Sequence, residues 1–283
     1  MRVKIIADSS CDLSDEIIKK YDFTVLPLHI IIDNKSFDDG VDITPDDIFK
    51  WCDEHKACPG TAGLSPYELG EAYKKYLMSY DYILCFSVAS TLSGTYNMMR
   101  ATARDLNMID KVYCINSKNL CSAIGLLMIK ARELLNKGKD IEYVYKKVRD
   151  LRPKVSSSFV VDTLDYLNRG GRCSDTVRLM GTALKIHPKI VVEDGNMRVT
   201  RKYRGNMKRV RSEYVAELHD SLKRADKDRA IISYSGPYID YIEEVRDCLL
   251  KEYRFKEVLV TRAGGVISSH CGPGTFAVFF IEK

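Results

Sequence analysis

The stretch "DYILCFSVASTLSGTYNMMRATARDL", residues 81–106, contains an apolar run, a loop of small hydroxyl residues and a helical segment, in that order. The run that ends at Ala89 has few polar residues, which is typical of a strand buried on both faces of a parallel sheet. The helical segment begins near Ser93 and Gly94. Because strands alternate with helices in α/β folds, the stretch predicts a parallel sheet with a small-residue loop at the carboxyl end of one strand.

The first half of the chain repeats this alternation. Thr44 precedes a proline and is expected to cap one helix, and Ser65 with Glu68 forms the capping box of the next. The run "FTVLPLHIIID", residues 23–33, is long enough to be a central strand. These features predict a mostly parallel sheet with helices on both faces.

The second half differs in pattern. Two apolar segments flank Asp194 and Gly195, a dipeptide typical of a tight β-hairpin turn, and further strands and helices follow. We therefore expect an α/β protein of two domains. Residues 1–155 would form the N-terminal α/β domain, and residues 156–283 a C-terminal domain of mixed α+β structure with its own strands and helices.

Composition limits the class of protein. The chain has 283 residues and a net charge of +5. It lacks the roughly 18-residue apolar run needed to cross a bilayer and begins without a signal-peptide pattern. We expect a cytoplasmic protein with no membrane span and at most transient contact with a membrane.

The nine cysteines lie mostly in apolar runs, which indicates reduced core thiols rather than disulfides. One cluster, Cys52, His55 and Cys58, resembles part of a zinc site. Zinc needs a fourth ligand and usually a paired Cys-x-x-Cys motif, and neither is present. We expect neither a metal nor a cofactor.

The densest positive charge lies in residues 198–211, "RVTRKYRGNMKRVR". This basic strip is interpreted as a solvated hairpin and helix start. A docking surface for an acidic or phosphorylated partner, and hence a role as an interaction protein, is the second interpretation. Nucleic acid is not expected, since only Tyr203 could stack on a base and no recognition motif is present.

Three polar loops follow apolar strands, at residues 8–10, 90–95 and 261–265. In open α/β sheets, ligands bind at the carboxyl ends of strands, beside the N-termini of helices. The unpaired N–H groups near Ser93 would favour an anion, and Gly94 would let it approach the backbone. The alternative is that Ser93 is only the N-cap of its helix.

Two further loops are candidates for the same site. Thr61 lies in the small-residue stretch 58–66, which could also be an ordinary turn, and His270 lies among glycines in residues 264–275, where it could be a histidine of a polar turn. A serine hydrolase using Ser93 and His270 is a possible alternative. However, the glycines of the nucleophile elbow are missing, and so are the patterns of phosphate loops and dinucleotide sites. The residues favour binding over catalysis.

Taken together, these motifs resemble the DegV family of bacterial fatty-acid-binding proteins along the whole chain. The matching stretches are "IIADSSCDL", the threonine loop before a Ser-Pro helix cap, "SVASTLSGTYN", "LDYLNRGGR", "KYRG" and "SHCGPGTFAVFF". The resemblance implies a lipid tunnel at or near the junction of two α/β domains. It also implies a carrier without catalysis, which binds a long-chain fatty acid and presents it to a fatty acid kinase that makes the acyl phosphate.

The resemblance assigns roles to individual residues. Thr61 and Ser93 would hold the carboxylate, with Gly94 beside them, while Arg172 and His270 would lie near the head group and Arg204 on the kinase-facing surface. The competing function is a serine-dependent acyl esterase or transferase that uses Ser93 and His270.

The chain departs from the family pattern at two places. Many members have Thr-Ser-Gln where this chain has Thr61, Ala62 and Gly63, so polar neighbours of Thr61 are lost while its hydroxyl is kept. Cys271 stands where threonine is expected.

Overall fold

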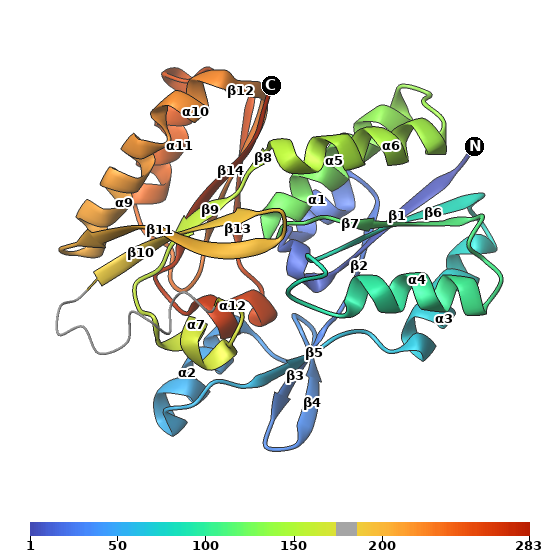
Figure 1. Cartoon of the computed structure of the whole chain (residues 1–283), viewed down its shortest axis with the longest axis horizontal. Coiled ribbons are helices and arrows are strands. Elements are labelled where there is room, and N and C mark those ends of the chain that lie inside the picture. The colour runs from blue at the N-terminus through green and yellow to red at the C-terminus, as the bar shows by residue number, and fades with distance from the viewer. Residues whose placement is uncertain (174–185) are drawn as a thin grey trace.

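The computed structural model describes residues 1–173 and 186–283. Three β-sheets organise this part of the chain, and Figure 1 shows the first on the right, the second on the left and the third below them. No helix of the described residues is both long and apolar enough to cross a membrane.

The first sheet has four parallel strands in the order β2-β1-β6-β7. These are β1 (Val3–Asp8), β2 (Phe23–Leu26), β6 (Tyr82–Ser87) and β7 (Val112–Asn116). Helices cover both faces (Figure 1): α1 (Asp15–Lys20), α5 (Ser122–Asn136) and α6 (Ile141–Leu151) on one side, α3 (Pro66–Leu77) and α4 (Thr95–Asp105) on the other. The neighbours Ile5 and Ile6 of β1 are fully buried in two different apolar clusters, one on each face. The predicted parallel sheet covered on both sides is confirmed.

The second sheet is mixed. Its strands run in the order β11-β10-β9-β14-β12-β13, with β8 also paired to β14, and the pair β12-β13 is parallel. They are β8 (Val155–Ser156), β9 (Ser158–Val160), β10 (Ile186–Glu193), β11 (Asn196–Arg204), β12 (Ala225–Tyr234), β13 (Glu257–Arg262) and β14 (Phe276–Glu282). One face is covered by α9 (Met207–Glu217), α10 (His219–Arg224) and α11 (Tyr241–Lys251). The mixed α+β architecture predicted for the second half is therefore observed.

The hairpin of β10 and β11 turns at Asp194 and Gly195, as the sequence predicts. Both residues have positive φ angles, 52° and 86°, which a two-residue turn of this kind requires.

The third sheet corrects one expectation. Residues 23–33 do not form one central strand: β2 ends at Leu26 at the edge of the first sheet, and β3 (His29–Ile32) pairs with β4 (Lys35–Asp38) and β5 (Gly60–Ala62) in an antiparallel sheet. Pro27 separates the two strands, because it has no N–H for a ladder. The next amide, of Leu28, donates to Ser9 Oγ at 3.1 Å instead of to a strand.

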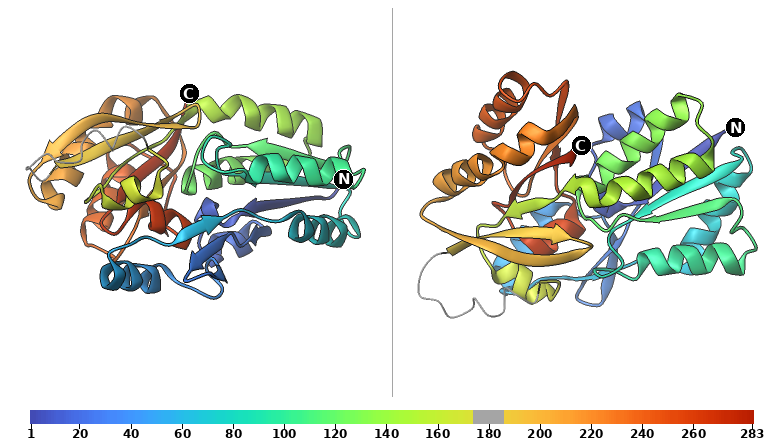
Figure 2. Two further views of the ribbon diagram at one scale, coloured as in Figure 1. Left: turned by 60° about the horizontal axis from the view of Figure 1, so that its bottom comes forward. Right: turned by 45° about the horizontal axis from the view of Figure 1, so that its top comes forward.

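Three short helices meet beneath the two large sheets. They are α2 (Pro45–His55), α7 (Asp165–Gly170) and α12 (Gly265–Cys271), and the views in Figure 2 show α12 (red) close to both α2 (blue) and α7 (yellow-green). The chain thus brings a helix from its last 20 residues against helices from its first and middle thirds.

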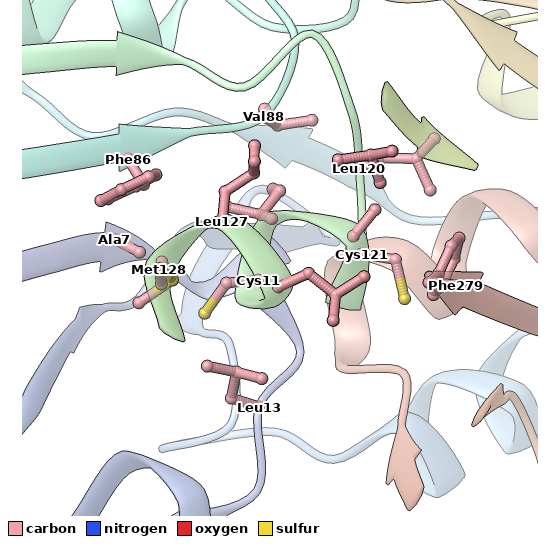
Figure 3. Close-up of a cluster of buried hydrophobic side chains, with 14 of the residues drawn as sticks. Ala7, Cys11, Leu13, Phe86, Val88, Leu120, Cys121, Leu127, Met128 and Phe279 are labelled. Atoms are coloured by element: carbon pink, nitrogen blue, oxygen red, sulfur yellow. The ribbon is translucent and has the colours of Figure 1, made fainter. Parts of the chain in front are cut away.

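Helix α5 joins the two large sheets into one core. Figure 3 shows Phe86 and Val88 above this helix and Phe279 of β14 beside Cys121 at its start. All four side chains belong to one buried apolar cluster. The strongly apolar sequence of α5 is explained by this position, since the helix contacts both the first sheet and the second.

Candidate functional site

The main cavity of the described residues lies where the carboxyl ends of the first sheet meet α12, β5 and the second sheet. Its space, including the opening to solvent, is about 900 Å³. Its apolar lining includes Leu28, Val88, Leu92, Leu120, Phe159, Leu167, Met197, Val266, Ile267 and Phe279. Each of the three polar loops predicted from the sequence contributes to the lining, through Ser10, Ser93 and Ala263.

Thr61 and His270 meet in the lining of this cavity. Thr61 Oγ1 lies 3.1 Å from His270 Nε2, although 209 residues separate them in the chain. Thr61 is held by strand pairing to Ile30 of β3, and His270 by helix α12. Two residues that the sequence marks separately therefore form one hydrogen-bonded pair.

The buried side of His270 is unusual. Its Nδ1 is inaccessible and has no hydrogen-bond partner among the described residues. The ring packs so closely on Gly170 that a Cβ there would lie 2.3 Å from Nδ1. Burial, with a further effect from the charge of Arg172, lowers the pKa of His270 to about 4. The imidazole is therefore neutral at pH 7.

Ser93 lies in the loop before α4. Its Oγ is 2.9 Å from Thr95 Oγ1 and accepts from the Thr95 amide at 3.3 Å. Ser93 is not the N-cap of α4, because that residue is Gly94, and it lines the cavity. The loops of Thr61 and Ser93 approach closely at Gly63, where a Cβ would lie 2.7 Å from Thr95 Oγ1. The structure thus brings Thr61, Ser93 and His270 to one cavity.

The remaining predicted residues lie at or outside the opening. Arg172 is exposed and lines the cavity, and its Nη1 donates to Gly170 O at 2.7 Å. Gly94 is the N-cap residue of α4 and is exposed, and it is not among the residues that line the cavity. Arg204 is exposed at the end of β11, outside the lining.

Two buried carboxylates place helix α12, and with it His270. Asp12 Oδ1 accepts from the Gly264 amide at 2.9 Å, and Asp39 Oδ1 accepts from the Gly265 amide at 2.7 Å. Burial raises the pKa of both carboxyls. Both acids come from the first 40 residues, so the N-terminal segment fixes the position of the C-terminal histidine.

Sequence reasoning missed part of the polar lining. Ser233, Ser235 and Thr275 lie at the ends of β12 and β14 and line the cavity. In the sequence they resemble ordinary strand ends, and nothing local marks them. Cys121 also lines the cavity, with its sulfur 3.2 Å from Ser233 Oγ, and its φ of 54° is rare for a residue that is not glycine.

The geometry of a serine hydrolase is not assembled. Ser93 Oγ bonds to Thr95 rather than to His270, and His270 bonds to Thr61. No carboxylate in the described part of the chain bonds to the free nitrogen of the histidine. Such catalysis requires a nucleophile that is hydrogen-bonded to a base, and a base that is hydrogen-bonded to an orienting acid.

Two other candidates from the sequence can be placed. No group of three or more potential metal ligands occurs among residues 1–173 and 186–283, and His55 bonds to the carbonyl of Trp51. In the basic strip, Arg198, Arg201 and Arg209 each pair with a glutamate. These ion pairs are consistent with a solvated surface, while Arg204 pairs with none of the described carboxylates.

Fold and cavity together define an α/β protein of two large sheets that share a core beside a mostly apolar cavity, which hydroxyl and imidazole groups also line. The chain belongs to the DegV family, described as uncharacterised proteins, whose model matches residues 2–283. The resemblance inferred from the motifs is thereby confirmed.

Several relatives are named for what they bind. A protein of Thermotoga maritima named as a fatty acid-binding protein is 31% identical, and the match covers 100% of this chain and 99% of that protein. A solved structure on fatty acid binding of a DegV family protein from Thermus thermophilus has a TM-score of 0.91 at 28% identity, covering 100% of both chains. A stearic acid-binding protein of Eubacterium ventriosum has a TM-score of 0.80 at 26% identity, covering 99% of this chain and 98% of that one.

Proposed function

We propose that the main cavity binds a long-chain fatty acid, with the carboxylate at the hydroxyls of Thr61 and Ser93 and the alkyl chain against the apolar lining. The observation that carries this proposal is a mostly apolar cavity whose lining also contains the hydroxyls of Thr61 and Ser93 and the neutral imidazole of His270. The names of the relatives agree with it.

The apolar lining supplies most of the affinity. Burying a 16-carbon tail at about 0.8 kcal/mol per methylene gives on the order of 12 kcal/mol before the cost of association is subtracted. The carboxylate then needs only enough donors to avoid being buried without partners. Because His270 Nε2 can donate to Thr61 Oγ1, the threonine hydroxyl is free to donate to the carboxylate.

The cavity provides hydroxyls rather than a buried cation for the head group. Arg172 is the cationic residue of the described lining, and it is exposed. A carboxylate held by hydroxyls is released more readily than one held in a buried salt bridge. This arrangement suits a carrier that presents its ligand to a fatty acid kinase, which we propose as the partner, without intrinsic catalysis.

Native mass spectrometry of the purified protein tests the binding. We expect a species heavier by a few hundred daltons, and uptake of palmitate or oleate after the lipid is removed. Protein that is free of lipid and takes up neither acid would refute the proposal. An activated acyl ester should give no burst of product, and a burst abolished by Ser93→Ala would show the esterase instead.

Ser93→Ala tests the position of the head group. We expect fatty-acid binding to weaken by about 1–3 kcal/mol, because a buried charged acceptor loses a donor. Ser212→Ala on the exposed face of α9 is the control and should leave the affinity unchanged. Equal affinities of the Ser93 variant and the wild type, measured by calorimetry with palmitate, would place the carboxylate elsewhere.

Arg204→Ala tests the proposed kinase-facing surface. Removing this unpaired cation should reduce capture by a fatty acid kinase at least several-fold while palmitate binding is retained. Arg246→Ala on α11, which removes the same charge from an exposed position, serves as the control. Capture that is the same for both variants and the wild type would show that residue 204 is only a solvated surface residue.

A further inference from the structure

A second hollow lies at the edge of the first sheet, separate from the main cavity. It forms where the end of β7, the edge strand, meets α4 on one side and α6 on the other (Figure 1). Its volume, including open space, is about 790 Å³. We call it the four-cation hollow after its lining, in which Arg100, Lys118, Arg149 and Arg152 are joined by Tyr96 and Tyr145.

The positive charge of this hollow is largely unneutralised. Arg100 and Arg149 pair with no carboxylate in the described part of the chain, and they lie over the rings of Tyr96 and Tyr145 at 5.9 and 5.3 Å. Lys118 pairs with Asp194 at the tip of the β10-β11 hairpin. Among the described residues, Asp194 is thus the one carboxylate that forms an ion pair with these four cations. Glu142 and Asp150 line the adjoining hollow along α6, which Arg149 and Arg152 also line, but they do not line the four-cation hollow.

Arg152 is fixed at the base of the hollow. It is partly buried, and it donates from Nη1 to Asn116 O at 2.8 Å and from Nε to Arg149 O at 3.0 Å. Burial, followed by the charge of Arg149, lowers its pKa. Two positive charges held close together repel each other, and an anion bound between them would offset this repulsion.

The hollow also lies at a place in the fold where ligands commonly bind. Asn116 is the last residue of β7, and its side chain bonds to Ser90, which begins the loop after β6. Both lie at the carboxyl edge of a parallel sheet, where open α/β folds bind their ligands. Arginines match phosphate oxygens through paired N–H groups, and tyrosine hydroxyls can donate as well.

We propose that the four-cation hollow binds a phosphate group that carries two or more negative charges, as in a diphosphate or a phosphate monoester. The group would lie between the guanidiniums of Arg100, Arg149 and Arg152, with the tyrosines at its sides. Such a group occurs on soluble metabolites, on nucleotides and on lipid head groups, and the chemistry of recognition is shared by all three.

Pyrophosphate is the first probe. We expect calorimetry with the full chain to show binding that Arg149→Ala and Arg100→Ala each weaken at least tenfold. Lys147→Ala removes the same charge from an exposed position of α6 outside the hollow, and should change the affinity less than twofold. Palmitate binding should be unchanged in all three variants, so that failure here is distinguishable from failure of the proposed fatty-acid site.

Two further probes identify the source of the phosphate. ATP binding that depends on Arg149 would indicate a nucleotide. Sedimentation with vesicles that contain phosphatidic acid, a phosphate monoester, but not with phosphatidylcholine vesicles, again lost in Arg149→Ala, would indicate a lipid head group. The proposal is overturned if none of the probes binds the wild-type protein at physiological salt. It is equally overturned if Lys147→Ala weakens binding as much as Arg149→Ala, since the effect would then be a general one of surface charge.

Discussion

At the scale of single residues, the site depends on glycines whose lack of a side chain lets other groups approach closely. Gly170 lets the ring of His270 approach, and Gly63 lets the loop of Thr61 approach Thr95. The lack of a side chain at Gly63 thus allows the two hydroxyl loops to lie against each other.

The protonation of His270 can be predicted at this scale. Its pKa is about 4 in the folded protein and about 6.5 when unfolded, so between these values the unfolded chain binds more protons. Protonation of His270 therefore favours the unfolded chain. It lowers the free energy of unfolding as the pH falls from 6.5 to 4, and it has no effect above pH 6.5. An NMR titration of lipid-free protein should give a ring midpoint near 4.

Arg172→Ala tests how much the charge of the arginine contributes to the lowered pKa of His270. It should raise the midpoint of His270 only modestly, because burial is the larger cause and the arginine charge the smaller one. A midpoint above 6 in the wild-type protein would mean that the ring is solvated, and that it does not hold the hydroxyl of Thr61 as described.

At the scale of elements, local sequence accounts for the helices that lead into the site. Ser65 caps α3, and Glu68 completes the capping box. The same box, formed by Thr44 and Asp47, begins α2. Both were predictable, because a cap depends on residues three positions apart. The split of residues 23–33 was not, since the partners that β2 and β3 choose lie in separate sheets.

Ser65→Ala tests the cap of α3. We expect the free energy of unfolding to fall by about 1 kcal/mol, since the amide of Glu68 loses its acceptor and the Glu68 carboxylate loses one of its donors. Ser79→Ala, at an exposed position beyond the end of α3, should change it by less than about 0.5 kcal/mol. Urea denaturation measures both, and equal effects would argue against a specific role for the cap.

At the scale of the whole molecule, contacts across the centre hold the two large sheets together. Arg229 of β12 donates to Glu257 of β13 at 2.6 Å, to Glu133 of α5 at 2.9 Å and to the hydroxyl of Tyr21 at 3.1 Å. Its side chain is 13% exposed. One residue thus links the second sheet to two segments that pack on the first.

Arg229→Ala should destabilise the protein by roughly 3 kcal/mol, because it leaves the partly buried Glu133 without its cation and Glu257 with only the exposed Lys20. Arg224→Ala, whose side chain is 63% exposed and lies 3.9 Å from Glu282, should cost less than about 1 kcal/mol. The measurement is again the free energy of unfolding in urea. A similar small cost for both variants would show that the two sheets are joined by the apolar core alone.

The packing of the whole molecule also explains why some residues of the two sites could not be predicted from the sequence. Thr61, Ser93 and His270 were named from their loops, but Ser233, Ser235 and Thr275 also face the cavity and have no local signature. Arg100, Arg149 and Arg152 resemble ordinary surface cations of two helices in the sequence. They form a hollow only because α4 and α6 pack on either side of β7.

The sequence by itself determined the alternation of strands and helices in the first half, the caps of α2 and α3, the hairpin turn and the family, because each depends on residues close together in the chain. Only the tertiary structure decided that Thr61 meets His270, that Asp12 and Asp39 hold the start of α12, and that four cations surround one hollow. Such contacts form between segments far apart in sequence, and their geometry depends on how the whole core packs around α5.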